Sequence, residues 1–95
     1  FIMDKNGLIF VDVLTFSNKA HIHLYKSGME LSSYVNLNEM ADTITQMAVN
    51  YGVNNIKLSG SPKYLEKYVK DIKEIEKQKY AYTNLEIEVI KVWNI

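Results

Sequence analysis

The sequence has no cysteine and no arginine, and it has only one proline and four glycines among its 95 residues. The absence of cysteine excludes a disulfide-stabilised fold, a thiolate metal site and redox chemistry at sulfur. No stretch approaches the roughly 18–20 consecutive apolar residues of a membrane-spanning helix, and no basic segment followed by an apolar one opens the chain. We therefore expect a cytoplasmic protein with no membrane partner.

The charges are balanced. Eleven lysines oppose eleven acidic residues, so the chain has no net field that would attract nucleic acid. Arginine is the residue that grips phosphate or guanine with two parallel hydrogen bonds, and lysine replaces it only as a point charge. A nucleic-acid partner is therefore disfavoured. The abundance of Lys, Asn, Ile and Tyr, whose codons are AT-rich, suggests a bacterial or phage source.

Hydrophobic residues make up 47% of the chain and charged residues 23%, which are the proportions of a globular protein. The length predicts one domain over residues 1–95.

Three segments near the N-terminus have the patterns of β-strands. Leu8–Phe16 is rich in β-branched and aromatic residues and is apolar on both faces, which is typical of a central strand. Ala20–Lys26 and Met29–Val35 alternate between apolar and polar residues. The turn residues at 17–19 and at 27–28 join these segments into an antiparallel meander.

The hydrophobic period then changes to that of helices. A first helix is predicted from Asn36 to Tyr51, with Asn36 and Glu39 as a capping box and Gly52 after its end. A second begins at Ser61-Pro62. Its apolar stripe consists of Tyr64, Leu65, Tyr68, Val69, Ile72 and Ile75.

Two further strands complete the prediction. Ile56–Ser59 lies between the helices, and Leu85–Trp93 follows a break in the pattern at residues 77–84. After Val89 the apolar phase shifts to Ile90 and Val92, which indicates either a bulge or burial on both faces.

The order β-β-β-α-β-α-β predicts an α/β (α+β) fold with a mixed five-stranded sheet. A meander followed by two right-handed crossovers gives the strand order 3-2-1-4-5, with both helices on one face.

This layout resembles the ribonuclease H-like fold group, which includes RNase H, Holliday-junction resolvases and actin-like ATPases. The resemblance rests on Asp12 in the first strand, the hairpin after it, and residues 56–60 before a helix. Nucleases of this group hold two magnesium ions with three or four carboxylates. Asp12 matches their first-strand aspartate, but the fourth strand ends in Ser59-Gly60 without an acid. The glycine-rich phosphate loops of actin-like ATPases are absent from residues 15–19.

Asp12 is thus the candidate acid if the protein is an enzyme. Its further ligands would have to come from Glu39 and Asp42 on the first helix or Asp71 on the second. The alternative is a structural carboxylate satisfied by the backbone or by a lysine.

His21 and His23 lie two residues apart, so they project from the same face of a strand and could chelate zinc or another transition metal. The neighbouring sequence supplies no third ligand. A catalytic role, or a half-buried polar and aromatic surface shared with Tyr25, is the alternative. We expect no bound metal and no cofactor.

The second face of the sheet is the most informative feature. Both helices are expected on one face, yet the first and last strands are apolar on both sides, and such a surface is unusual for a monomer. We expect another chain to cover it, most simply a second copy, although a missing companion domain would give the same pattern. The candidate interface residues are Val11, Val13, His21, His23, Tyr25, Tyr34, Ile90 and Val92.

The sequence therefore favours a non-catalytic protein-binding or self-associating accessory module of phage or mobile-element origin. The alternative is a metal-dependent nuclease or a nucleic-acid-binding protein of RNase H-like fold. The lysines of the second helix are interleaved with acidic residues, which is the pattern of a solvated helix.

Overall fold

The computed structural model describes residues 6–81 and 83–92 of the chain. The elements follow the order β1 (Leu8–Leu14), a 3₁₀ turn η1 (Thr15–Ser17), β2 (Lys19–Lys26), β3 (Met29–Asn36), α1 (Leu37–Tyr51), β4 (Asn55–Gly60), α2 (Pro62–Lys79) and β5 (Glu86–Lys91). The five strands form one sheet in the order β3-β2-β1-β4-β5, which confirms the predicted topology.

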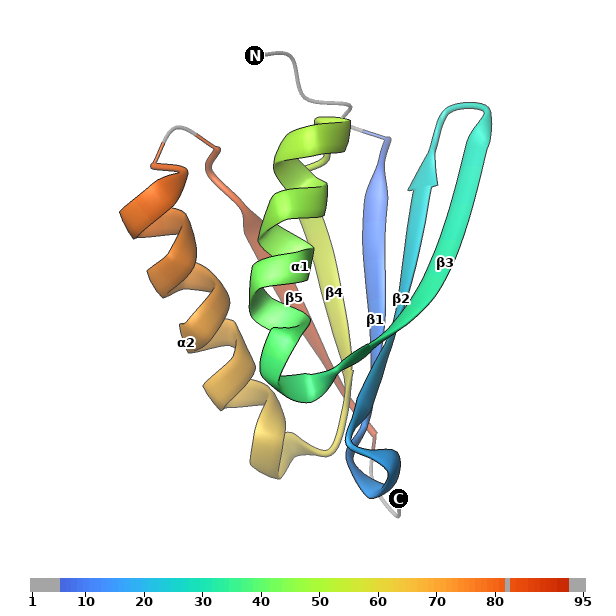
Figure 1. Cartoon of the computed structure of the whole chain (residues 1–95), viewed down its shortest axis with the longest axis vertical. Coiled ribbons are helices and arrows are strands. Elements are labelled where there is room, and N and C mark those ends of the chain that lie inside the picture. Colours follow the sequence, from blue (N-terminus) through green and yellow to red (C-terminus); the bar gives the residue numbers. More distant parts are fainter. Residues whose placement is uncertain (1–5, 82, 93–95) are drawn as a thin grey trace.

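The pairing of the strands follows from the connections between them. β2 runs antiparallel to β1 and to β3, because short turns join these strands. β1, β4 and β5 run parallel, because each crossover passes through a helix. Both helices lie on the same face of the sheet, as predicted, with α1 in front of its centre (Figure 1).

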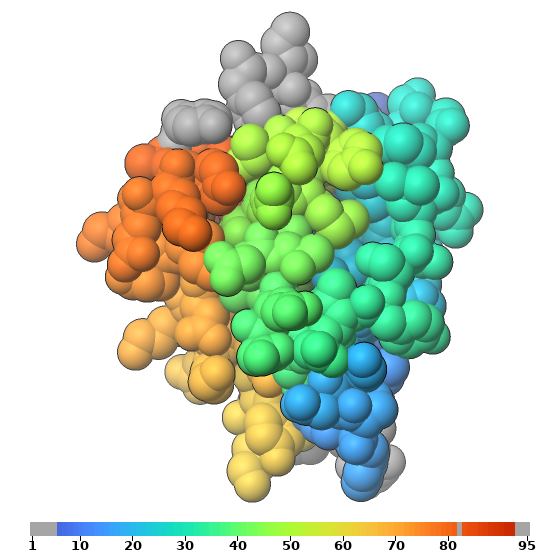
Figure 2. Space-filling view, viewed as in Figure 1, coloured from blue at the N-terminus to red at the C-terminus, as the bar shows by residue number. Residues whose placement is uncertain are grey.

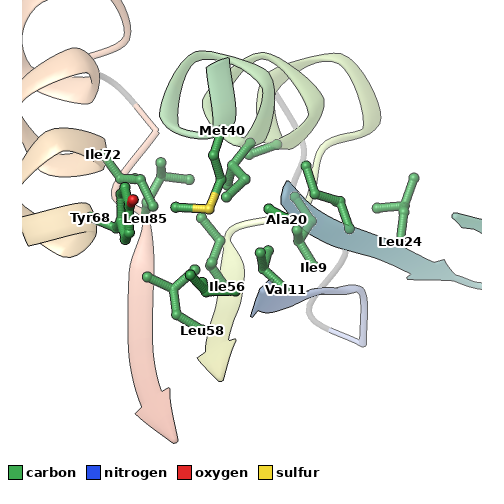
Figure 3. Close-up of a cluster of buried hydrophobic side chains, with 14 of the residues drawn as sticks. Ile9, Val11, Ala20, Leu24, Met40, Ile56, Leu58, Tyr68, Ile72 and Leu85 are labelled. Atoms are coloured by element: carbon green, nitrogen blue, oxygen red, sulfur yellow. The ribbon is translucent and has the colours of Figure 1, made fainter. Parts of the chain in front are cut away.

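The hydrophobic core lies between the helices and this face. In Figure 3, Met40 of α1 reaches down towards the sheet, while Tyr68 and Ile72 of α2 enter the cluster from the left, beside Leu85. The buried apolar residues are Ile9, Val11, Val13, Ala20, Ile22, Leu24, Met40, Ile44, Ala48, Val53, Ile56, Leu58, Leu65, Tyr68, Ile72 and Leu85. In the space-filling view of the helical side, α1 fills the centre between α2 and the β2–β3 hairpin (Figure 2).

The predicted helices are confirmed, but their N-terminal caps differ from the prediction. Asn36 makes no side-chain cap hydrogen bond, because its side-chain oxygen accepts one from Lys19 Nζ at 2.9 Å instead. Ser61 makes none either; its backbone oxygen accepts from Tyr64 and Leu65. Gly52 ends α1 in the left-handed conformation that its position required, with φ of 67°.

The first strand is shorter than predicted, and the last one begins at Glu86, one residue later than predicted. β1 ends at Leu14, because residues 15–17 turn into η1 and Asn18 adopts a left-handed backbone with φ of 57°. Phe16, which was predicted inside the strand, is 91% exposed. The predicted end of the last strand at Trp93 lies outside the described residues. The register between β4 and β5 is continuous from Asn55 to Gly60, so the shift of phase in β5 reflects two apolar faces rather than a bulge.

The orientation of β1 determines which of the predicted interface residues on this strand are exposed. Val11 is fully buried and Val13 is 5% exposed, because the odd-numbered residues of β1 face the helices. The prediction that these two valines lie on an uncovered face is therefore wrong. Tyr64, predicted within the apolar stripe of α2, is 39% exposed.

Candidate functional site on the open sheet face

We use the term open sheet face for the side of the sheet opposite the helices. Within residues 6–81 and 83–92, no helix packs on it (Figure 1). It carries the alternate residues of each strand, which are Leu8, Phe10, Asp12, Leu14, Lys19, His21, His23, Tyr25, Glu30, Ser32, Tyr34, Asn36, Asn55, Lys57, Ser59, Glu86, Glu88 and Ile90, and Val92 continues beyond β5. Six of the eight predicted interface residues therefore lie on this face.

The centre of the open sheet face brings together Asp12, His21 and His23. The antiparallel register places Asp12 of β1 directly opposite His21 of β2, and His23 lies one step further along β2 on the same face. The side chains offer one ligand atom each, and these three atoms lie within 4.8 Å of one another. The histidine pair thus acquires from the neighbouring strand the third ligand that the local sequence did not supply.

Asp12 and His23 also form a direct polar contact. His23 Nε2 lies 3.5 Å from Asp12 Oδ2, an ion pair when the imidazole is protonated. The side chain of His23 is 20% exposed and that of Asp12 is 39% exposed. The group is therefore shielded from water on one side and open on the other.

Aromatic rings hold both imidazoles in place. The ring of Tyr34 stacks on that of His21, with centroids 4.1 Å apart and planes 11° apart. The two imidazoles lie 4.0 Å apart, and Phe10 meets His23 edge-on at 6.2 Å. Tyr25 lies parallel to His23 at 6.1 Å. These contacts restrict the rotamers of both histidines, because each ring has a neighbour on at least one side.

Exposed apolar side chains surround this centre. Tyr34 is 63% exposed, and Leu14, Tyr25, Ile90 and Val92 lie between 36% and 39%. Ile90 is in register with Ser59, which is itself opposite Asp12.

The carboxylates that an RNase H-like nuclease would need are not gathered around Asp12. Asp12 points away from the helices, whereas Glu39 and Asp42 lie on α1 and Asp71 lies on α2. Asp42 approaches Lys79 at 3.9 Å, and Asp71 approaches Lys67 at 3.4 Å. The sheet thus separates Asp12 from the helix acids, which does not fit a magnesium pair held by these residues.

Two features of the structure do not follow from the sequence pattern. Asp12 and the histidines are separate candidates in the sequence, because the register that joins them depends on where the first strand ends. Glu76 is a buried carboxylate on α2 that accepts hydrogen bonds from Thr83 and from the backbone of Leu85. Because lysines and acidic residues alternate along α2, the sequence pattern did not distinguish the buried Glu76 from the exposed acidic residues of this helix.

Comparisons with known protein families, with curated proteins and with solved structures found no match. No helix among the described residues combines the length and the apolar character needed to cross a membrane.

Proposed function

We propose that this chain is a non-catalytic protein-binding module that self-associates through the open sheet face. The observation that carries the proposal is the one-sided covering of the sheet, which leaves Tyr34, Ile90 and Val92 exposed on the other side. A layered α/β fold normally buries both faces of a sheet whose central strand is apolar on both sides.

The composition of this face suits an interface. Tyrosine is enriched at protein interfaces because its ring is apolar and its hydroxyl tolerates partial hydration, and two exposed tyrosines lie here. The two longer dimensions of the molecule, 39 and 30 Å, bound the face along which the sheet lies. Such a face is wide enough for the roughly 800 Å² that each partner contributes to a standard interface.

A second copy of the chain is the partner that fits best. The zero net charge means that two copies do not repel each other at long range. The open sheet face carries both lysines and acids, including the Lys57–Glu88 pair at 3.5 Å. In a two-fold dimer the same surface of each copy meets its counterpart. A face that carries both positive and negative side chains can therefore pair opposite charges across such a contact.

The test is the solution mass of the chain, measured by light scattering over a dilution series. We expect twice 11.0 kDa at high concentration, decreasing towards 11.0 kDa on dilution. Tyr34→Glu places a charge on the open sheet face and should give a monomer at every concentration. Tyr64→Glu is the matched control, because Tyr64 is an exposed tyrosine on α2, on the opposite side of the sheet.

Three results would contradict the proposal. One is a wild-type chain that remains a monomer throughout the series. The second is a Tyr34→Glu variant with a native circular dichroism spectrum and an unchanged dimer. The third is a dimer that Tyr64→Glu dissociates and Tyr34→Glu does not, because the helical side would then form the interface.

A further inference from the structure

We infer that Asp12, His21 and His23 form a binding site for a divalent transition-metal ion, with zinc as its best fit. Two imidazole nitrogens and one carboxylate oxygen are the donor types that zinc takes in proteins. Their atoms lie within 4.8 Å of one another on two hydrogen-bonded strands.

The distances are within reach of one ion. Zinc bonds to nitrogen and oxygen of about 2.0–2.2 Å allow two ligands of the same ion to lie at most about 4.4 Å apart. The closest polar atoms of Asp12 and His23, 3.5 Å apart, already satisfy this limit. The other separations among the three ligand atoms are at most 4.8 Å, and the backbone register keeps the three side chains on one face of the sheet.

The donor set selects the class of metal. Imidazole suits zinc, copper, nickel and ferrous iron, whereas magnesium and calcium prefer oxygen ligands. The site therefore differs in kind from the magnesium pair that the RNase H-like resemblance implied, and magnesium should not compete for it.

The protein frame favours binding because it orients the histidines in advance. Both come from one strand, and Tyr34 stacks on His21 while Phe10 contacts the edge of His23. Ligands on regular strands whose rings are held by neighbours lose little freedom when they bind a metal.

Three protein ligands leave a fourth position of a tetrahedral zinc ion free for water or an external donor. The Asp12 side chain is 39% exposed, so solvent reaches this group of ligands. All three ligands belong to one chain, so this inference does not depend on self-association.

The test uses the purified chain, freed of any histidine tag and treated with a chelator. Titration with Zn²⁺ in a calorimeter should give one ion per chain. Titration with Co²⁺ should produce visible absorption bands that excess Zn²⁺ removes, while Mg²⁺ should give no heat. Asp12→Asn and His21→Ala should each weaken Zn²⁺ binding by at least about tenfold.

The matched control is Asp42→Asn, which removes a carboxylate from the exposed surface of α1 and should leave the affinity unchanged. Circular dichroism of each variant confirms that it is folded. The inference is overturned if the wild-type chain shows no Zn²⁺ heat and no Co²⁺ absorption. It is also overturned if Zn²⁺ binding is unchanged in a His21→Ala/His23→Ala double variant. Zinc binding by a monomeric chain would support this site and contradict only the proposed self-association.

Discussion

The hydroxyl of Thr83 donates a hydrogen bond to the carboxylate of Glu76, 2.8 Å away, between the connection that precedes β5 and the last turns of α2. The same carboxylate accepts the backbone N–H of Leu85 and lies 3.7 Å from Lys73 Nζ. Because the side chain is only 11% exposed, these partners replace the water that it loses on folding. Glu76 thus holds the connection between α2 and β5 against the helix.

We predict that Glu76→Gln lowers the free energy of unfolding by about 1–3 kcal/mol, because an uncharged amide is a weaker acceptor and its NH₂ group faces donors. Urea denaturation followed by circular dichroism measures the change. Glu74→Gln is the matched control, because Glu74 is exposed and its carboxylate accepts a hydrogen bond from Gln78, one turn further along the helix. The control should stay within about 0.5 kcal/mol of the wild type. Equal midpoints for both variants would show that the Glu76 contacts contribute nothing to stability.

The strand and helix order could be predicted from the sequence because each element has its own hydrophobic period. Strands with one polar and one apolar face, such as Ala20–Lys26, fix their own orientation towards the core. β1 does not, because Phe10 and Val11 are both apolar and either could face the helices. That ambiguity placed Val11 and Val13 among the interface residues, although packing under α1 and α2 buries them.

The meeting of Asp12 with His21 could not be predicted, because it depends on where the first hairpin turns. A turn centred on Asn18, as the residue types suggested, would place Leu24 opposite Asp12. The strand instead ends at Leu14, which pairs with Lys19 across η1, and the register brings His21 opposite Asp12. β1 ends two residues earlier and β2 begins one residue earlier than predicted, and together these shifts decide whether Asp12 meets His21.

The end of β4 packs so closely on β1 that a methyl group added there would push its neighbours aside. A Cβ added to Gly60 would lie 3.1 Å from Val13 Cβ and 3.2 Å from the Val13 backbone oxygen. Because the backbone oxygen cannot rotate away, Gly60→Ala should lower the free energy of unfolding by about 1–3 kcal/mol. Ser59→Ala, one residue earlier on the open sheet face, should change it by less than about 0.5 kcal/mol. Urea midpoints measure both changes, and a Gly60→Ala midpoint equal to that of Ser59→Ala would refute the close packing.

Val11 and Ile90 illustrate how the burial of apolar side chains differs between the two faces of the sheet. Val11 is fully buried on the helical side, with Ile22 and Leu58 as its register partners, whereas Ile90 is 36% exposed on the open sheet face. A glutamate at position 11 would have no partner for its charge among these apolar side chains. We predict that Val11→Glu costs more than about 4 kcal/mol, most of the stability of a marginal domain.

Ile90→Glu should retain the fold, with a loss of about 1 kcal/mol or less, because its charge remains in water. Circular dichroism and urea denaturation of the two variants at equal, low concentration measure the difference without interference from self-association. A folded Val11→Glu variant beside an unfolded Ile90→Glu variant would place the helices on the other side of the sheet. If Ile90→Glu is folded, as we expect, light scattering can also be used on this variant to test self-association through the open sheet face. A lower mass than that of the wild type could then not be attributed to unfolding.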